Sequence, residues 1–475
     1  MSVRVRFAPS PTGLLHIGNA RTAIYNYLYA KAKSGTLILR VEDTDSERST
    51  KEFEVKQRED LAWLGLAFDE GPEIGGDYGP YRQSERLHIY REWAQKLIGK
   101  GQAFHCFCTE DELTARKEKS LAEGGAGHYD GTCRRLTESD VKNKSAQGLK
   151  SVVRFCVPHK AYDLHDHVRS LVHFPADMVG DFVLIRSDGI PVYNYAVVVD
   201  DILMKITHVI RGEDHLNNSV RQLMIYEAFG AKAPEFAHAS LLIGKDRQKL
   251  SKRHGATSVC QYREDNYLPE SLVNYLCLLG WSHPEEKDVF DLVEAAKHFD
   301  MDRLNDSPAV YDLEKLAYIN GQHLRAKSNA QIVQGISACV DPGHAYHRQT
   351  QEWKERLAQM AKRDMHFYKD IASKLELIFE VNPPKDAEFD IVNGWPSTDL
   401  IRKFLREKLA HENGDGFLAL PQWEALAADV KAQLKLKGKE LFQGMRLCLT
   451  CQAHGPDLKE LIPLTSISIL KQRLA

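Results

Sequence analysis

The sequence predicts an α/β domain with a parallel sheet, interrupted by an inserted module and followed by an all-helical C-terminal region. Three observations lead to this prediction. Residues 3–41 have the pattern strand, helix, strand, which is typical of a parallel crossover unit. Runs rich in Val and Ile return at residues 193–211, as expected for strands covered on both faces. Beyond residue 260, apolar residues recur at helical spacing almost throughout.

The first strand, residues 3–7, leads into a loop and then into a helix. Proline and glycine at residues 9–13 exclude helix, and apolar residues recur at helical spacing over 20–28, so the helix begins near Gly18. Its N-terminus points out of the loop, where free backbone N–H groups and a partial positive charge can bind a phosphate. His16 adds a donor, and Gly18 lets a nucleotide approach the backbone closely. The loop therefore predicts a nucleotide-binding site.

A second buried strand, residues 36–41, is followed directly by Glu42. Ligands of open α/β sheets bind outside the carboxyl ends of the strands, so Glu42 is expected at the same rim as the first loop. The following residues, 51–105, are expected to be mainly helical. Further strands are expected at residues 151–156, 181–186, 193–201, 206–211 and 238–243.

The last of these strands leads into a cationic loop at residues 244–253. In-line displacement on ATP requires cations opposite the phosphate-binding loop, and this segment supplies them. A plain solvated surface loop is the alternative. The sequence has no Gly-x-x-x-x-Gly-Lys-Ser/Thr pattern, so a Walker-type site is not supported.

Cysteines mark the start of the inserted module. Cys106, Cys108 and Cys133 offer three thiolates, whereas a structural zinc site requires four ligands in a tetrahedral arrangement. Tyr129 or His128 is the candidate fourth ligand. The sequence supports two interpretations equally, one structural Zn²⁺ or a group of free buried cysteines.

Composition and charge are those of a protein with sizeable cores, since 43% of the 475 residues are hydrophobic and 27% are charged. A net charge of -3 gives no sign of nucleic-acid binding, so any contact with RNA must come from local basic patches. The last 45 residues are one such patch, with eight Lys or Arg against three Asp or Glu. Nine cysteines do not form a disulfide framework, and no leader or long apolar run is evident. We therefore expect a cytoplasmic protein.

Two stretches resemble the signatures of the class I aminoacyl-tRNA synthetases. Arg6 to Arg21 is similar to the first signature in its glutamyl form, Arg-Phe-Ala-Pro-Ser-Pro-Thr-Gly-x-x-His-x-Gly, with Asn19 where the general class signature ends in His. Lys249 to Lys252, Lys-Leu-Ser-Lys, is similar to the second. The pair is far more specific than either stretch alone, and the similarity extends over nearly the whole chain. The sequence thus resembles the bacterial-type glutamyl-tRNA synthetase family.

The resemblance implies an activity and a division of the chain. The implied reaction is the ATP- and Mg²⁺-dependent activation of L-glutamate, followed by transfer to the 3'-terminal adenosine of tRNA(Glu). We expect a monomer with no DNA partner and no membrane partner, and glutamine isoacceptors of tRNA stay open as further substrates. The implied parts are a Rossmann-type catalytic domain at 1–105 and 187–245, an acceptor-binding insert at 106–186, a stem-contact region at 246–318 and a helical anticodon-binding region at 319–475.

The resemblance also implies roles for individual residues. The catalytic residues are His16, Lys249 and Lys252. Contacts with ATP are expected from Pro9, Ser10, Gly13, His16, Gly18, Asn19, Lys249, Ser251 and Lys252. Contacts with glutamate are expected from Arg6, Ala8, Ser10, Glu42, Tyr193 and Arg211. For zinc, the resemblance places a histidine two residues after the third cysteine, where this chain has Arg135, so the ligands expected here are Cys106, Cys108, Cys133 and, from the sequence alone, Tyr129.

Other functions fit the sequence less well. A glutaminyl enzyme has a β-barrel anticodon-binding half, whereas residues 320–475 look helical, and a shortened tRNA-modifying relative lacks that half. A small nucleotidylyltransferase shares the His-x-Gly type of loop but does not explain 475 residues or the second signature. A non-enzymatic tRNA-binding scaffold is disfavoured because His16, Gly18, Lys249 and Lys252 are all present.

Overall fold

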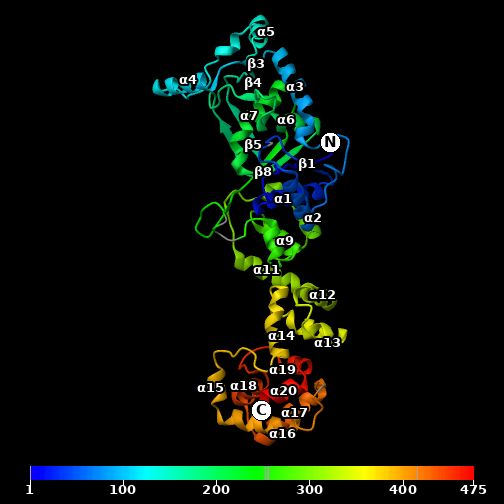
Figure 1. The fold of residues 1–475 in the computed structure, drawn as a ribbon. Coiled ribbons are helices and arrows are strands. Elements are labelled where there is room, and N and C mark those ends of the chain that lie inside the picture. Colours follow the sequence, from blue (N-terminus) through cyan, green and yellow to red (C-terminus); the bar gives the residue numbers. More distant parts are fainter. Residues whose placement is uncertain (1, 46, 252, 254–255, 415) are drawn as a thin grey trace. The chain divides into compact units, whose positions relative to one another are not determined.

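The computed structural model describes residues 2–45, 47–251, 253, 256–414 and 416–475. The chain forms two compact units, Met1–Leu313 and Glu314–Ala475. Figure 1 shows the first unit in blue to green and the second in yellow to red. Within the described ranges, no helix is both long enough and apolar enough to cross a bilayer.

A mainly parallel sheet forms the centre of the first unit. As predicted, β1 (Arg4–Phe7) pairs in parallel with β2 (Thr36–Leu39). On the other side of β1, the N–H of Thr207 donates to the carbonyl of Arg4 at 2.9 Å, which places β8 (His208–Gly212) next to β1. β8 pairs in parallel with β9 (Glu235–Ala239).

The same sheet continues into a hairpin that the sequence did not reveal. β9 is followed in the sheet by β5 (Tyr162–Asp166), and β5 pairs in antiparallel fashion with β6 (Ser170–Phe174). Both strands lie within the predicted insert at 106–186. The insert therefore contributes one hairpin to the central sheet.

A second sheet contains the strands predicted at 151–156 and 181–186. These are β4 (Val152–Phe155) and β7 (Val183–Ile185), and β3 (Ala103–Cys106) pairs with the other side of β4. The strand predicted at 238–243 is divided, because β9 ends at Ala239 and a separate short strand, β10 (Leu242–Ile243), pairs with β11 (Ala309–Val310).

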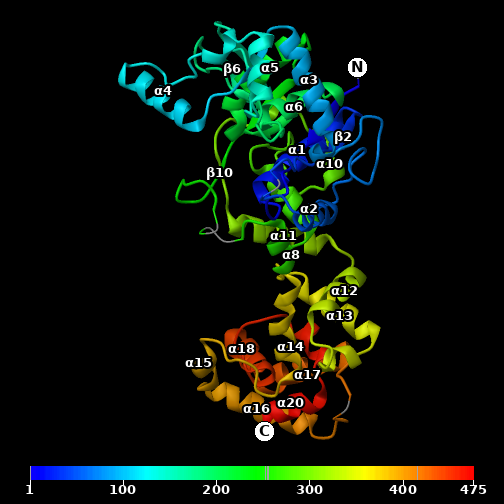
Figure 2. The ribbon, with the colours of Figure 1, turned by 45° about the horizontal axis from the view of Figure 1, so that its top comes forward.

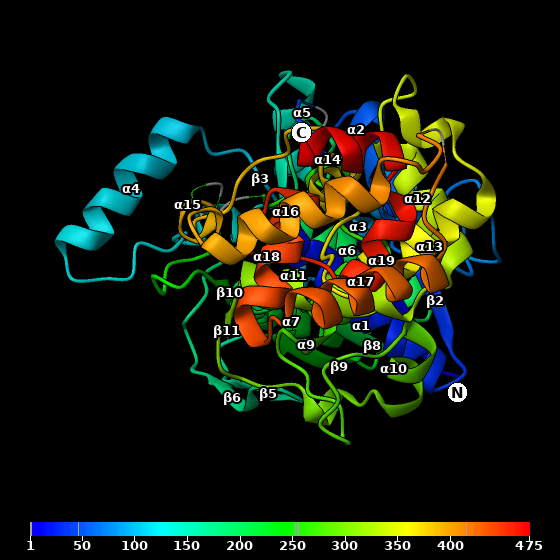
Figure 3. The same cartoon turned by 90° about the horizontal axis from the view of Figure 1, so that it is seen from below.

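Helices cover the central sheet and complete the first unit. The central sheet packs against α1, which also contacts α9 and α10, and Figure 2 shows α1 beside α10. α4 has no buried residue and projects from the rest of the unit in Figures 1, 2 and 3. The α-helices are α1 (Ile17–Ala32), α2 (Lys51–Trp63), α3 (Leu87–Gly99), α4 (Glu110–Ala122), α5 (Glu138–Ala146), α6 (Tyr193–Leu203), α7 (Ser219–Phe229), α8 (Val259–Glu264), α9 (Pro269–Leu278) and α10 (Leu292–His298).

The prediction of a strand at 193–201 is wrong, because these residues form the first turns of α6. A segment that is buried on all sides has no polar face, so its periodicity does not separate a strand from a helix. The structure shows why the helix is preferred. In a strand, Asp200 and Asp201 would face opposite sides of the sheet, whereas on α6 both carboxylates lie within 4 Å of the guanidinium of Arg40.

The described residues of the second unit form helices and no strand, as predicted. α16, α17, α18 and α20 pack around one core, and Figure 3 shows α16 and α18 side by side. The helices are α11 (Leu313–Ala326), which begins at the boundary, α12 (Asn329–Cys339), α13 (Gln351–Ala361), α14 (Ile371–Phe379), α15 (Phe389–Asn393), α16 (Pro396–Leu409), α17 (Leu420–Leu434), α18 (Gly438–Thr450), α19 (Leu458–Leu461) and α20 (Ile467–Leu474).

Candidate active site

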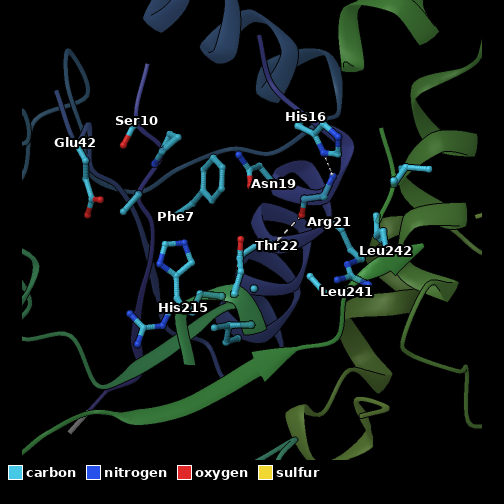
Figure 4. Close-up of a pocket in the computed structure, with 18 of the residues that line it drawn as sticks. Phe7, Ser10, His16, Asn19, Arg21, Thr22, Glu42, His215, Leu241 and Leu242 are labelled. Atoms are coloured by element: carbon cyan, nitrogen blue, oxygen red, sulfur yellow. Dashed lines mark hydrogen bonds between the residues drawn. The ribbon is translucent and has the colours of Figure 1, made fainter. Parts of the chain in front are cut away.

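A cavity of about 510 Å³ opens at the carboxyl ends of β1 and β8, against the first turn of α1. Figure 4 shows Glu42 and Ser10 on one side of this pocket and His16 and Leu242 on the other. The pocket brings together most of the residues that the sequence indicated. These are Arg6, Ala8, Pro9, Ser10, His16, Gly18, Asn19, Glu42, Tyr193, Arg211 and Lys249.

Two of the described residues that were predicted to contact ATP, Gly13 and Ser251, are not among the residues that line the pocket. Gly13 lies outside the lining, and its carbonyl accepts a hydrogen bond from Gln57 at 2.7 Å, so Gly13 shapes the loop. Ser251 is described and also lies outside the lining. Lys252 lies outside the described residues.

His16 caps α1 and faces the pocket. Its Nδ1 accepts a hydrogen bond from the N–H of Gly18 at 3.0 Å, so the proton of the neutral imidazole is on Nε2. Burial, assisted by the charge of Lys249, lowers the pKa of His16. The ring therefore offers a neutral N–H donor beside the positive end of a helix, a combination suited to a phosphate.

The segment that carries the first signature is fixed to residues that follow the second signature in the chain. The N–H of Ile17 donates to the carbonyl of Thr257, and the N–H of Val259 donates to the carbonyl of Leu15, both at 2.9 Å. Within the cationic loop, the N–H of Leu250 donates to the carbonyl of Leu242 at 3.0 Å. Both of these residues line the pocket, so the loop is held at the rim of the pocket at Leu250.

Arg211 carries a buried charge that forms no ion pair with another described residue. Its Nε donates to His238 at 3.0 Å and its Nη2 donates to Ser219 at 2.8 Å, while the buried Nη1 has no hydrogen-bond partner in the described part of the chain. Among the described residues, no carboxylate lies within ion-pair distance of Arg211, and burial lowers the pKa of its guanidinium. A buried cation that has no ion-pair partner is stabilised by an anionic ligand, so this part of the pocket suits a carboxylate.

Arg6 and Glu42, in contrast, belong to a buried ion-pair network. Arg6 Nε lies 3.3 Å from Asp201, and Arg40 lies 2.6 Å from Asp201 and 3.1 Å from Glu42. Burial raises the pKa of Glu42 although Arg40 and Arg6 lower it. Arg6 therefore has a counter-charge inside the protein and differs in this from Arg211, although the sequence analysis expects both arginines to contact glutamate.

Exchanging Asp201 for Asn is expected to lower the free energy of unfolding by about 2 kcal/mol, the scale of hydrogen bonds to charged groups. Although burial opposes it, the charges of Arg6 and Arg40 hold the pKa of Asp201 below its ordinary value. Such a carboxylate stabilises the protein above its unfolded pKa of about 4, and this contribution is lost as the pH falls through the folded pKa. The difference between parent and variant should therefore shrink below about pH 4.

Urea unfolding at a series of pH values tests this prediction. Asp45→Asn is the matched control, because the carboxylate of Asp45 is exposed and pairs with the exposed Arg48. The control should unfold like the parent. Equal stability of Asp201→Asn and the parent at neutral pH would show that the network does not depend on this charge.

Tyr193 lies at the first turn of α6 rather than on a strand, and it still lines the pocket. Its ring packs at 5.4 Å from that of His215. Burial raises the pKa of Tyr193, so the hydroxyl stays protonated and can donate a hydrogen bond beside Arg211.

Comparison with known proteins agrees with this geometry. Residues 2–318 match the family of class I tRNA synthetases (E and Q), catalytic domain, and residues 328–475 match an anticodon binding domain. A glutamate–tRNA ligase of Caldicellulosiruptor saccharolyticus is 44% identical over 100% of this chain and 98% of its own length. The chain belongs to the glutamate–tRNA ligase family of class I synthetases.

A second relative and a solved structure are also similar to the synthetase over its full length. A glutamate–tRNA ligase of Desulforamulus reducens is 43% identical over 98% of this chain and 97% of the relative. A crystal structure of a glutamate tRNA ligase from Elizabethkingia meningosepticum, in complex with its amino acid, has a TM-score of 0.90 at 31% identity and covers 100% of this chain and 98% of that chain. The likeness thus includes both units of the synthetase.

Several pocket residues of the synthetase were missed by sequence reasoning. Asp214 and His215 follow β8 directly, so the rule that ligands bind at strand ends could have found them. Arg21 could not be found in this way. Its side chain donates to the carbonyls of Ser240 and Leu279, which are more than 200 residues away in the sequence. The other residues of the lining that were missed are Phe7, Thr12, Thr22, Ile210, Gly212, Ser240, Leu241, Leu242 and Leu250.

The cysteines of the insert form a cluster in the synthetase. The thiol sulfurs of Cys106, Cys108 and Cys133 lie within 4.8 Å of one another. The hydroxyl of Tyr129 lies 3.4 Å from the sulfur of Cys106 and 3.6 Å from that of Cys108. His128, the other candidate, is engaged with the carbonyl of Asp177 instead. Three thiols this close together suit a structural zinc site, and the hydroxyl of Tyr129 lies beside them.

Proposed function

We propose that the pocket activates L-glutamate with ATP and passes the glutamyl group to the 3'-terminal adenosine of tRNA(Glu). The observation that carries this proposal is Arg211, a buried cation that forms no ion pair with another described residue, in the same pocket as His16 and Lys249. One part of the pocket thus suits a carboxylate and another suits phosphates. The names of the curated relatives, glutamate–tRNA ligases, agree with this assignment.

In the first step, a carboxylate oxygen of glutamate attacks the α-phosphorus of ATP, an O–P bond forms, and pyrophosphate leaves. Arg211 and Arg6 would orient the carboxylates, and Glu42 would accept hydrogen bonds from the ammonium group. His16 and Lys249 would meet the negative charge that develops on the phosphates, and Lys252, outside the described residues, is proposed for the same role. Mg²⁺ would accompany the phosphates of ATP. Pro9, Ser10, Gly18 and Asn19 would surround the nucleotide.

In the second step, a hydroxyl of the terminal ribose of tRNA attacks the activated carbonyl, an ester bond forms, and AMP leaves. No side chain of the protein has to act as a nucleophile, because alignment and charge neutralisation are sufficient. We propose that the insert at 106–186 contacts the acceptor end, that residues 246–318 contact the stem, and that the helical region at 319–475 contacts the anticodon. We also propose a monomer that acts in the cytoplasm.

Pyrophosphate exchange into ATP tests the amino-acid assignment. The purified protein is assayed with each of the twenty amino acids, with and without tRNA. Exchange that depends on glutamate is expected. Exchange that depends on another amino acid, or none with any amino acid in the presence of tRNA, would refute the proposal.

We further propose that Cys106, Cys108, Cys133 and Tyr129 hold one structural Zn²⁺. When bound, the metal would supply a cross-link within the insert. Protein purified without chelator should contain about one equivalent of zinc, and Cys133→Ser should contain less than a tenth of that.

Cys156→Ser is the matched control for the metal analysis. Cys156 packs beside the cluster but is not one of its three thiols. This control should keep the metal content of the parent. Less than a tenth of an equivalent in the parent would identify the cluster as free cysteines.

A further inference from the structure

The guanidinium of Arg211 is held along one edge by two buried side chains. Nε donates to Nε2 of His238 at 3.0 Å, and Nη2 donates to Oγ of Ser219 at 2.8 Å. His238 and Ser219 are fully buried. This arrangement leaves Nη1 without a hydrogen-bond partner among the described residues, on a side chain that lines the pocket. His238 and Ser219 therefore set the direction in which the guanidinium of Arg211 presents Nη1.

His238 can accept this hydrogen bond only in one tautomer. Its Nδ1 lies 2.6 Å from Oδ2 of Asp166, and a carboxylate oxygen can only accept, so the ring proton is on Nδ1. Nε2 then carries a lone pair that faces Arg211. Burial, assisted by the charge of Arg211, lowers the pKa of His238 to about 4, so the ring is neutral near pH 7.

Asp166 is itself fixed by the backbone. Its Oδ1 accepts hydrogen bonds from the N–H groups of Val168 at 3.0 Å, Arg169 at 2.9 Å and His238 at 3.2 Å. With Oδ1 occupied in this way, Oδ2 is the oxygen that meets the imidazole. Asp166 ends β5, so the chain of contacts runs from the hairpin β5–β6 to the pocket.

We propose that Asp166 and His238 are positioning residues, which set the tautomer of the imidazole so that Arg211 presents Nη1 to a carboxylate of the substrate. This inference rests on the proposed function, because it assumes that glutamate occupies the pocket. A purely structural role would stabilise the sheet without favouring one substrate. The positioning role affects the binding of glutamate and leaves the binding of ATP unchanged.

Asp166→Asn separates these two roles, because it keeps the shape of the side chain. The three backbone N–H groups require an acceptor, so the amide oxygen should occupy the place of Oδ1 and the NH₂ group should face Nδ1 of His238. The amide then donates, the imidazole proton moves to Nε2, and Nε2–H opposes the Nε–H of Arg211. The same logic explains why an Asp-to-Asn exchange behind a catalytic histidine selects the wrong tautomer.

In pyrophosphate exchange, Asp166→Asn should raise the KM for glutamate by about tenfold or more, the scale of a lost hydrogen bond to a charged group. We expect kcat at saturating glutamate to stay within about threefold of the parent and the KM for ATP within about twofold, because the phosphate-binding residues are untouched. An unchanged KM for glutamate would overturn the proposal. A parallel rise of the KM values for glutamate and ATP would also overturn it, because it would indicate general damage.

Asp163→Asn is the matched control. Asp163 lies on the same strand, and its carboxylate pairs with the exposed His173 at 2.6 Å. This variant loses an equivalent contact on the outer face and should keep the KM values of the parent. Absence of glutamate-dependent exchange in the parent itself would instead refute the proposed function, so the two failures are distinguishable.

A second set of variants covers the case that Asp166→Asn does not fold. His238→Gln can place its amide oxygen where Nε2 stands and should raise the KM for glutamate less than His238→Leu, which offers no acceptor. In the parent, ¹⁵N spectra of labelled histidine, assigned by difference with His238→Gln, should show His238 protonated on Nδ1. Equal KM values for the two variants, or an Nε2–H tautomer in the parent, would contradict the inference.

Discussion

Replacing Arg211 with alanine is expected to lower kcat/KM for glutamate by at least about a hundredfold. The variant leaves a substrate carboxylate buried without its partner, which typically costs about 3 to 5 kcal/mol, and each 1.4 kcal/mol corresponds to a factor of ten. The preference for glutamate over glutamine should decrease with it, because glutamine has no side-chain charge to lose. Pyrophosphate exchange with both amino acids, in the presence of tRNA, measures the two effects.

Two comparisons sharpen this prediction. Arg58→Ala removes an arginine of α2 that pairs with the exposed Glu73, outside the pocket, and should behave like the parent. Arg6→Ala should also weaken glutamate binding, but it additionally removes one of the two arginine partners of Asp201 and so affects stability. If Arg211→Ala retained both the affinity for glutamate and the preference for glutamate over glutamine, the pocket would not recognise its substrate by charge through Arg211.

Replacing Lys252 with alanine is expected to slow the formation of the adenylate by about a hundredfold to a thousandfold. This is the typical loss when a preorganised charge no longer meets a transition state. Lys252 lies outside the described residues, so this prediction rests on the second signature, of which Lys249 lines the pocket. Lys249, which lines the pocket, should give a smaller effect when replaced.

Single-turnover formation of the adenylate measures this step directly. Lys245→Ala, in the same loop, is a suitable control because Lys245 lies 3.3 Å from Asp312 and not on the pocket lining. Its rate should match that of the parent. A Lys252→Ala rate within a few-fold of the parent would show that the second signature is only a surface loop here.

The local features of the pocket could be predicted from the sequence. Proline and glycine between Pro9 and Gly13 exclude helix, and the spacing of the apolar residues after Gly18 defines α1, so the start of the helix was expected near its observed position at Ile17. The strand–helix–strand pattern of residues 3–41 likewise predicts Glu42 at the rim of the sheet, and Glu42 does line the pocket.

Features that depend on distant partners could not be predicted. Asp201 is the counter-charge of Arg6 and lies 195 residues away in the sequence. Arg211 is hydrogen-bonded to His238, and His238 is hydrogen-bonded to Asp166, which lies 72 residues before His238. β5 was missed because most of its residues are polar, and its place in the sheet depends on pairing with β9. No local pattern encodes such contacts.

Transfer of labelled glutamate to purified tRNA(Glu) tests the central claim most directly. With ATP, Mg²⁺ and the parent protein, the account predicts glutamyl-tRNA that forms on tRNA(Glu), is lost when ATP is omitted, and is reduced at least about a hundredfold at limiting glutamate in Arg211→Ala. Formation of another aminoacyl-tRNA from a mixture of amino acids, or no glutamyl-tRNA from a transcript that an active glutamate–tRNA ligase does charge, would contradict it.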